Sequence, residues 1–252
     1  MEDDLRMASK VQLAMMPRAQ PPFADGAATL RIASHFHPAG SVSGDFFDVL
    51  RMQDQTVGIL VCDVMGHGVR SALITAMVRA MLEQLAPVAS DPGALLTRLN
   101  RDLTRILRQT GDLIFVTAAY CVLAPRIGLV RYSKAGHPTP LLWDHSEGTV
   151  RSLACPDAAA GPALGLVDDF EFAATEESIA SGDRVVIFTD GIVEAASDES
   201  EEFGTPRLAG SWARRVSEPL EEAVSGLFGD AAAFHGSTAF EDDVCIVAAE
   251  LE

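Results

Sequence analysis

Aspartates that stand beside a glycine or a second aspartate recur along this chain of 252 residues. They are Asp45 after Gly44, Asp63 in Asp63-Val64-Met65-Gly66-His67-Gly68, Asp190 before Gly191, and the Asp242-Asp243 pair. Apolar runs typical of buried strands adjoin the last three groups, at residues 57–61, 185–188 and 244–247. A carboxylate at the end of a buried strand must be solvated, paired or bound to a cation, because burying an uncompensated charge costs several kcal/mol.

Basic residues close in sequence are lacking around these carboxylates. No Lys or Arg occurs around Asp45 between Arg31 and Arg51, and none occurs around Asp63 between Arg51 and Arg70. An aspartate beside a glycine commonly begins a turn or caps a helix, and this interpretation stays open for each group taken singly. Several such groups together favour a site for hard divalent cations, which oxygen ligands suit. If the carboxylates converge, their mutual repulsion makes the cation part of the folding energetics.

Hydrophobic periodicity predicts the elements that must position these groups. Apolar spacings of three and four predict helices over residues 3–16, about 71–86, about 92–109 after the N-cap Asp91, and from Thr205-Pro206 through Val216. Apolar runs predict strands over residues 30–37, 57–64, 113–123, 129–135, 141–143, 184–189 and 244–248, and residues 145–182 are expected to be irregular. Strands that bracket a helical pair and also close the chain favour one α+β domain with helices packed on sheets.

The composition excludes several partners and locations. With 36 Asp and Glu against 19 Lys and Arg, the net charge is −17, which argues against binding to nucleic acid. No apolar stretch is long enough to span a membrane, and the acidic N-terminus lacks the apolar segment of a signal peptide. The cysteines are scattered, at Cys62, Cys121, Cys155 and Cys245, and form no C-x-x-C pair. Three of them lie in apolar, strand-like runs and are expected to be small buried thiols, so we expect a reduced, cytoplasmic chain.

Other catalytic chemistries find no support in the sequence. There is no Gly-x-Ser-x-Gly turn for a nucleophilic serine, and Gly66-His67-Gly68 lacks the spacing of a phosphate-binding P-loop. His35 and His37 alternate along one polar face of a predicted strand, and His137 is expected to be a turn residue that holds strand ends. We therefore predict no zinc site, because zinc prefers clustered His and Cys ligands.

Short motifs follow one another in a recognisable order from one end of the chain to the other. They are Val11-Gln12 with Met15-Met16-Pro17, Val42-Ser43-Gly44-Asp45-Phe46-Phe47-Asp48, Asp63-Val64-Met65-Gly66-His67-Gly68 with Ala72, Phe115-Val116-Thr117-Ala118, Tyr132-Ser133-Lys134-Ala135-Gly136-His137-Pro138, Gly161-Pro162-Ala163-Leu164-Gly165, Thr189-Asp190-Gly191-Ile192-Val193-Glu194-Ala195, Phe203-Gly204 and Asp242-Asp243-Val244. The ordered set resembles the SpoIIE/RsbU-type branch of the PPM family of metal-dependent serine/threonine phosphatases. Departures from the family pattern, at Ser43, Met65 and Lys134, remove no carboxylate.

This resemblance implies a fold and a metal site. The fold would be an α-β-β-α sandwich of two antiparallel sheets flanked by helices, with two Mn²⁺ or Mg²⁺ ions at one edge. By position, Asp63 would bridge both ions, and the Val64 carbonyl would complete one shell. Asp190 and Asp242 would bind one ion, with Asp243 as the alternative to Asp242. Asp45 would bind the other ion directly or through water, whereas Asp48 would have a structural role.

The resemblance also implies a reaction and its partners. Two such ions generate a bridging hydroxide that attacks the phosphorus of phosphoserine or phosphothreonine, and His67 is the candidate general acid. The implied substrate is a phosphorylated anti-sigma-factor antagonist domain.

Residues 1–17 resemble the family's regulatory linker, ahead of a phosphatase domain at 18–252. We expect this linker to mediate homodimerisation or to receive a signal from an upstream sensor domain. Two alternatives stay open: a signalling adaptor of the same fold that acts by binding, and a module that binds a cation without turnover.

Overall fold

The helices and strands of the computed structural model are defined over residues 2–17, 22–24, 28–52, 55–66, 68–156 and 160–252. The helices are α1 Glu2–Met15, α2 Val69–Gln84, α3 Pro92–Leu107, α4 Asp190–Val193, α5 Gly204–Arg214 and α6 Leu220–His235, with short 3₁₀ turns η1 Ala86–Val88, η2 Arg108–Thr110 and η3 Pro125–Ile127. The strands are β1 Phe23–Ala24, β2 Thr29–His37, β3 Asp45–Arg51, β4 Val57–Val64, β5 Val116–Ala124, β6 Leu129–Ala135, β7 Leu141–Asp144, β8 Thr149–Ser152, β9 Ala160–Gly161, β10 Thr175–Ser178, β11 Arg184–Phe188 and β12 Val244–Leu251.

Within these described residues the strands form two sheets. Sheet A has the order β1-β2-β12-β11-β7-β8, and sheet B has the order β10-β6-β5-β4-β3. All of these neighbours pair antiparallel, while β9 adds a short parallel pair to β6. The predicted sandwich of sheets flanked by helices is therefore confirmed, and parallel pairing is limited in the described residues to the β9 pair and a single bridge between Ala118 and Gly136.

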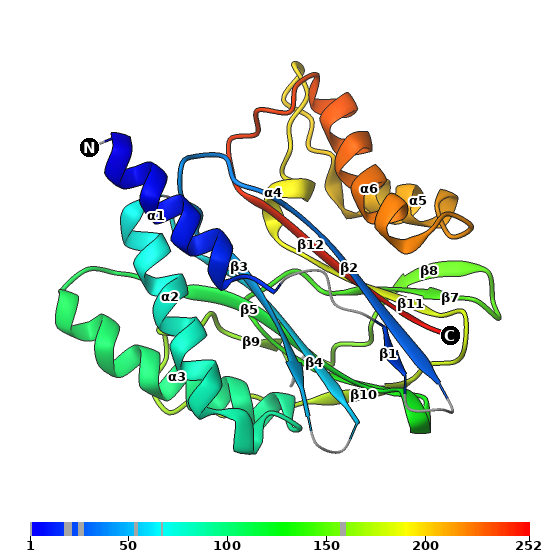
Figure 1. Ribbon diagram of the computed structural model, residues 1–252, viewed down its shortest axis with the longest axis horizontal. Helices are drawn as coiled ribbons and strands as arrows, with labels where there is room; N and C mark the ends of the chain where they lie inside the picture. Colours follow the sequence, from blue (N-terminus) through cyan, green and yellow to red (C-terminus); the bar gives the residue numbers. More distant parts are fainter. Residues whose placement is uncertain (1, 18–21, 25–27, 53–54, 67, 157–159) are drawn as a thin grey trace.

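Helices cover the outer faces of both sheets (Figure 1). The N-terminal helices α1, α2 and α3 lie on the side of sheet B, and α4, α5 and α6 lie on the side of sheet A. Residues of β12 alternate between two hydrophobic cores: Cys245 and Val247 face sheet B, whereas Val244 and Ile246 face α6. A strand covered on both faces needs apolar residues at successive positions, which explains its unbroken hydrophobic sequence.

Most of the predicted elements are present. The strands predicted at 57–64 and 129–135 match β4 and β6, and Asp91 caps α3 by accepting a hydrogen bond from the Ala94 amide at 3.0 Å. The predicted helix at 205 begins instead at Gly204 after the N-cap Phe203, and Val216 lies beyond its end at Arg214. The expectation of an irregular 145–182 is wrong, because β8, β9 and β10 lie there. Strand β3 and helices α4 and α6 were not predicted.

The structure bears on two predictions from the sequence, the absence of a membrane-spanning segment and the burial of the cysteines. Across the part of the chain that is described, no helix combines the length and apolarity needed to cross a membrane. Cys62, Cys121 and Cys245 are buried free thiols, as predicted, while Cys155 is half-buried. Burial raises the pKa of the Cys62 thiol well above its usual range, with the charge of Asp45 acting in the same direction. These thiols are therefore packing residues and not reactive ones.

Candidate active site

Strand register brings the first two aspartates to one edge of sheet B. Asp45 at the start of β3 lies directly opposite Asp63 near the end of β4, and Asp63 lies opposite Thr117 of β5. Side chains of directly opposed residues lie on the same face of a sheet, with Cβ atoms about 5 Å apart. The antiparallel pairing of β3 and β4 thus brings Asp45 and Asp63 together although they are distant in sequence.

Asp45 joins the two sheets. Its carboxylate is buried, and Oδ2 accepts a 2.7 Å hydrogen bond from the hydroxyl of Thr189, which follows β11 in sheet A. The Thr189 hydroxyl in turn accepts a 2.9 Å hydrogen bond from the Cys245 amide of β12. Burial raises the pKa of Asp45 well above its ordinary value, and the negative charge of Asp63 acts in the same direction. Thr189 favours the charged form but does not outweigh these two effects.

Asp190 and Asp242 act electrostatically on Asp63, and Asp242 acts on Asp190. Burial raises the pKa of Asp63 to about 7, and the charges of Asp190 and Asp242 contribute next. The pKa of Asp190 is also raised, first by burial and then by Asp242. Because like charges disfavour each other's ionised form only at short range, carboxylates from β4, from α4 and from the segment before β12 lie near one another.

Close backbone contact holds Asp190 beside Asp242. Gly191 packs so tightly that a Cβ at this position would lie 2.0 Å from the Asp243 carbonyl oxygen and 3.5 Å from the Asp242 carbonyl carbon. Only glycine allows the first turn of α4 to approach the chain before β12 in this way. The two short motifs Asp190-Gly191 and Asp242-Asp243 therefore form one unit.

The space in front of Gly44 is lined by oxygen atoms. A Cβ at Gly44 would lie 2.8 Å from the Val64 carbonyl oxygen, 3.0 Å from that of Gly66 and 3.3 Å from Asp63 Oδ1. The Val64 amide donates a 3.1 Å hydrogen bond to the Gly44 carbonyl, which fixes this approach. Gly44 thus leaves room beside a carboxylate and a backbone carbonyl, both of which are donors for hard cations.

Neighbouring Asp242 and Asp243 have different environments. Asp243 is buried, and its two carboxylate oxygens accept 2.8 Å hydrogen bonds from the Ala39 and Gly44 amides. Asp242 is exposed, and its Oδ1 accepts a hydrogen bond from the Asp243 amide at 2.8 Å. Asp243 is therefore occupied in holding the loop between β2 and β3, which supports Asp242 as the residue with oxygens available to a ligand.

Other residues singled out in the sequence lie around this site and not within it. Asp48 forms an ion pair with Arg79 of α2 at 3.2 Å, so its carboxylate ties α2 to β3. His137 is buried, with Nδ1 2.9 Å from the Thr117 hydroxyl, and it links the turn after β6 to β5. His35 and His37 stack or tilt against Phe228 of α6, so they lie on a covered face of β2 and not on an open polar one. His67 lies outside the described residues.

Gln12 of α1 is a residue whose role the sequence did not indicate. Its side chain is buried although its neighbours Val11 and Leu13 are exposed. The amide nitrogen donates to the Ser43 carbonyl at 2.7 Å, and the amide oxygen accepts from the Ser43 amide at 2.9 Å. The amide nitrogen also lies 3.1 Å from the Thr75 hydroxyl of α2. A glutamine within the Val11-Gln12 motif was visible, but its distant partner was not.

The donor set at this edge fits a divalent metal. Carboxylates of Asp63, Asp190 and Asp242 and the Val64 carbonyl supply oxygens only, which suits Mn²⁺ or Mg²⁺ better than Zn²⁺. No ion pair to these three carboxylates is found among the described residues, so their repulsion has no protein cation to offset it. As placed in the described part of the chain, no three His, Cys, Asp or Glu side chains are close enough together to enclose an ion.

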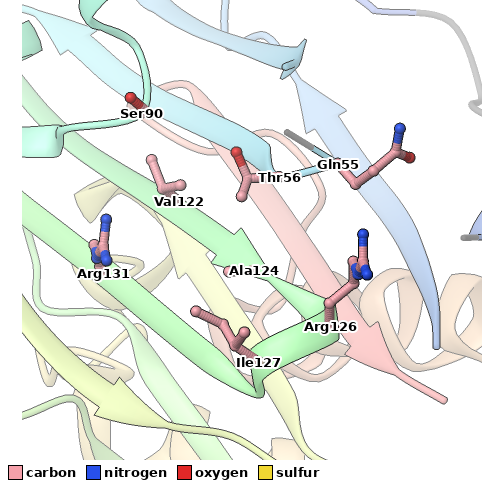
Figure 2. A pocket seen from close by; sticks show the side chains of 8 residues that line it. All are labelled: Gln55, Thr56, Ser90, Val122, Ala124, Arg126, Ile127 and Arg131. Atoms are coloured by element: carbon pink, nitrogen blue, oxygen red, sulfur yellow. The ribbon is translucent and has the colours of Figure 1, made fainter. Parts of the chain in front are cut away.

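A groove of about 650 Å³ opens beside the carboxylates. Gly191 and Glu194 line one wall, Phe240 and Asp242 line the other, and His235 contributes to the lining between them. A separate pocket of about 420 Å³ lies at the opposite end of β4 and β5, where Thr56, Ser90, Val122 and Arg131 contribute to its lining (Figure 2). The described lining of that second pocket includes no carboxylate, so only the first groove adjoins the candidate site.

Comparison with known proteins identifies the family to which the chain belongs. A model of the family described as Stage II sporulation protein E (SpoIIE) matches residues 53–252, well over half of the chain. The phosphoserine phosphatase RsbP of Bacillus subtilis (strain 168) is 28% identical over 166 residues, which make up 66% of this chain and 40% of RsbP. The chain therefore spans less than half the length of this relative.

Solved structures share the fold. The SiaA-PP2C domain of Pseudomonas aeruginosa matches with a TM-score of 0.82 at 23% identity, covering 99% of this chain and 96% of that one. The catalytic domain of the serine/threonine phosphatase PstP, solved in complex with two manganese ions, matches with a TM-score of 0.64 at 18% identity, covering 89% and 99%. The family match confirms the resemblance seen in the motifs: the chain belongs to the SpoIIE family, the SpoIIE/RsbU-type branch of the PPM phosphatases.

Proposed function

We propose that this chain is a metal-dependent protein phosphatase that hydrolyses phosphoserine or phosphothreonine on a signalling partner. The observation that carries the proposal is that Asp63, Asp190 and Asp242 come from separate segments and lie near one another at one edge of the sandwich, where Asp190 and Asp242 both act to raise the pKa of Asp63. Membership of the SpoIIE family supports the same function, as does the phosphoserine phosphatase activity for which the relative RsbP is named.

Asp63, Asp190 and Asp242, with the Val64 carbonyl and Asp45, are the residues that would hold two Mn²⁺ or Mg²⁺ ions. The oxygen-lined space in front of Gly44 supports this assignment, and so does the presence of two manganese ions in the PstP structure of the same fold. When bound, such ions activate a water molecule as the nucleophile and neutralise the phosphoryl oxygens.

The protein's own residues would hold these ligands in position. Thr189 orients one oxygen of Asp45 from the opposite sheet, and Asp243 fixes the loop that carries Gly44. Cation binding also competes with protonation of Asp63. Because the pKa of Asp63 is raised to about 7, this carboxyl group must lose a proton to bind a cation near neutral pH. His67 as the general acid stays a prediction from the sequence.

The phosphorylated partner is proposed to be an anti-sigma-factor antagonist domain. This proposal rests on family membership and on the RsbP relative alone, because no surface of the described residues identifies a particular protein. A cytoplasmic location likewise stays a prediction from the sequence.

Residues 1–17 are proposed to act as a regulatory helix attached to a phosphatase domain at 18–252. Helix α1 packs against α2, and Gln12 connects it to Ser43, two residues before Asp45. Away from Gln12, α1 exposes Met7 and Val11, which lie one turn apart on one face with exposed fractions of 61% and 54%, and Leu13 on another side with 52%. Exposed apolar side chains one helical turn apart, Met7 and Val11, favour pairing with the same helix of a second copy.

The oligomer proposal is tested by light scattering after size-exclusion chromatography. The substitution V11E should shift a dimer to a monomer, because it places a charge in the apolar contact. Lys10 is exposed on the same helix, so K10E is the matched control and should leave the dimer intact. Deletion of residues 1–16 should also abolish the dimer, and an unchanged mass for both V11E and the deletion would contradict the proposal.

The reaction is tested by following hydrolysis of p-nitrophenyl phosphate and of a phosphoserine peptide with added Mn²⁺ and with a chelator. The expected result is turnover of both substrates that depends on Mn²⁺ and stops when the metal is removed. Metal binding without turnover would support the cation-binding alternative. Failure of both would leave a binding adaptor as the better account.

A further inference from the structure

His235 lies between the two walls of the groove beside the candidate site. One wall is formed by α4 and the segment that follows it, including Ala196. The other wall is the loop between α6 and β12, which carries Ala239, Phe240 and Asp242. His235 is the last residue of α6, so its side chain stands where the two walls meet.

Both ring nitrogens of His235 face backbone carbonyl oxygens. Nδ1 lies 2.5 Å from the Ala196 oxygen, and Nε2 lies 3.3 Å from the Ala239 oxygen. The imidazole also meets the Phe240 ring edge-on, with 5.1 Å between centroids and an interplanar angle of 82°. The Phe240 ring in turn packs on Phe228 at 5.2 Å, which fixes the orientation of the imidazole from the side of α6.

This geometry distinguishes the two protonation states of the ring. A carbonyl oxygen only accepts hydrogen bonds, so each needs an N–H facing it. A neutral imidazole has one N–H and would leave a nitrogen lone pair facing the other carbonyl oxygen. The imidazolium has two N–H groups and donates to Ala196 and Ala239 together, which joins the two walls.

We propose that His235 is a positioning residue for the substrate polypeptide, whose protonated ring holds the two walls of the groove at a fixed spacing next to Asp242. The inference rests on the proposed phosphatase function, since it concerns how the phosphorylated segment is held beside that site. Protonation of His235 lowers KM for a phosphoserine peptide, because a groove that is already formed does not have to be ordered during binding. For a small substrate that contacts only the phosphate site, protonation of His235 lowers KM less.

Acidic side chains from both walls line the groove around His235. Glu194 and Asp198 line the groove from the first wall, and Glu241 and Asp242 line it from the second. From β2, His37 lies across Phe240, with 6.4 Å between the rings, and from α6, Asp230 is engaged by Arg215 at 2.7 Å. From α5, Arg207 lies over the Phe234 ring at 4.6 Å. The four groove carboxylates also indicate which probe to use, namely a phosphoserine peptide with flanking arginines.

The test compares KM and kcat of the Mn²⁺-loaded chain for this peptide and for p-nitrophenyl phosphate, between about pH 5.5 and pH 8.5, the range in which histidines ordinarily titrate. KM for the peptide should rise by about fivefold with increasing pH, the factor that corresponds to one hydrogen bond, while KM for the small ester changes less. H235F keeps the ring contact with Phe240 but has no donor, so its peptide KM should be high and independent of pH. H235Q retains one donor and should lie between the two. H145Q, at an exposed histidine in the turn after β7, is the matched control and should follow the wild type.

The outcomes separate this inference from the proposed function. A peptide KM with the same pH dependence as that of the small ester, or an H235F profile like that of the wild type, would overturn the role of His235 alone. If Mn²⁺ supports no hydrolysis of either substrate, the proposed phosphatase function fails, and the positioning role fails with it. If H235F does not fold, the H235Q profile and the wild-type comparison of the two substrates decide the question.

Discussion

The side-chain amide of Gln12 pairs with both hydrogen-bonding groups of the Ser43 backbone, at 2.7 and 2.9 Å. Ser43 precedes Gly44, whose amide is held by Asp243 and whose carbonyl accepts from the Val64 amide. Gln12 on the N-terminal helix therefore holds the residue next to Gly44, which borders the oxygen-lined space of the candidate metal site. Movement of α1 would change the backbone that positions Asp45.

Replacing Gln12 by alanine should weaken both stability and metal binding. The buried Ser43 amide and carbonyl would lose their partners, at a cost of about 2 kcal/mol in the free energy of unfolding. The Mn²⁺ concentration for half-maximal activity should rise by about tenfold, since the loop before Asp45 is less ordered. Urea unfolding and a metal titration of activity measure these two effects. Gln84 is exposed at the end of α2, so Q84A is the control, and an unchanged metal requirement in Q12A would contradict the coupling.

Much of the fold could be predicted because buried strands and amphipathic helices carry strong patterns. β4 is apolar at nearly every position, since both of its faces are covered, and the Asp91-Pro92 pair marks the start of α3. β8 and β10 were missed because they are edge strands with exposed, polar residues. Helix α6 buries residues three and four apart, but some of them are alanines, which weaken the hydrophobic signal.

The candidate site was predictable in its members and not in their arrangement. A nearby glycine or a second aspartate marked Asp45, Asp63, Asp190 and Asp242 in the sequence, and at Gly44 and Gly191 a close backbone approach requires the glycine. The separate roles of Asp242 and Asp243 depend on which amide faces each carboxylate, and this is set by the loop between β2 and β3. The partners of Gln12 and Thr189 are likewise distant in sequence, so no local pattern could show them.

Asp63→Asn should abolish turnover and stabilise the metal-free chain. Its buried carboxylate is acted on by the charges of both Asp190 and Asp242, so its removal relieves repulsion and raises Tm without metal. Loss of the same charge should reduce kcat at least about a hundredfold. Differential scanning fluorimetry with a chelator and the p-nitrophenyl phosphate assay with Mn²⁺ measure the two effects. D112N, at an exposed aspartate paired with Arg70, should behave as wild type; a lower metal-free Tm in D63N would refute the electrostatic account.

Asp242→Asn should weaken metal binding, whereas Asp243→Asn should lower the stability of the metal-free chain. D242N should bind Mn²⁺ more weakly while the metal-free Tm does not fall, because Asp242 is exposed and its charge adds to the repulsion on Asp63. D243N places an amide NH₂ against the Ala39 or Gly44 amide, so the free energy of unfolding should fall by about 2 kcal/mol without metal. Mn²⁺ should raise the Tm of the wild type by mass action, and the concentration required gives the affinity for each variant. If D243N proves to be the variant with normal stability and weak metal binding, the assignment of the two residues is reversed.

His137 should make the free energy of unfolding depend on pH. Burial lowers the pKa of His137 to about 3, with the charge of Lys134 acting in the same direction, whereas an unfolded histidine titrates near 6.5. Below about pH 6.5 the unfolded chain therefore binds a proton that the folded chain does not, and stability falls by up to about 1.4 kcal/mol per pH unit from this group. Asp63 acts with the opposite sign, because its raised pKa makes the folded chain bind the extra proton.

A comparison of variants isolates the contribution of His137 from that of the carboxylates. H137Q can still hydrogen-bond the Thr117 hydroxyl but does not titrate, so its stability should fall less than that of the wild type between about pH 7 and pH 5. Urea unfolding at both pH values, with a chelator present, gives the difference. H145Q is the control, because His145 is exposed and should leave the wild-type slope intact. If the free energy of unfolding of H137Q and of the wild type changes equally between the two pH values, His137 becomes protonated in the folded chain. That result would contradict a buried, neutral His137 ring between β5 and the turn after β6.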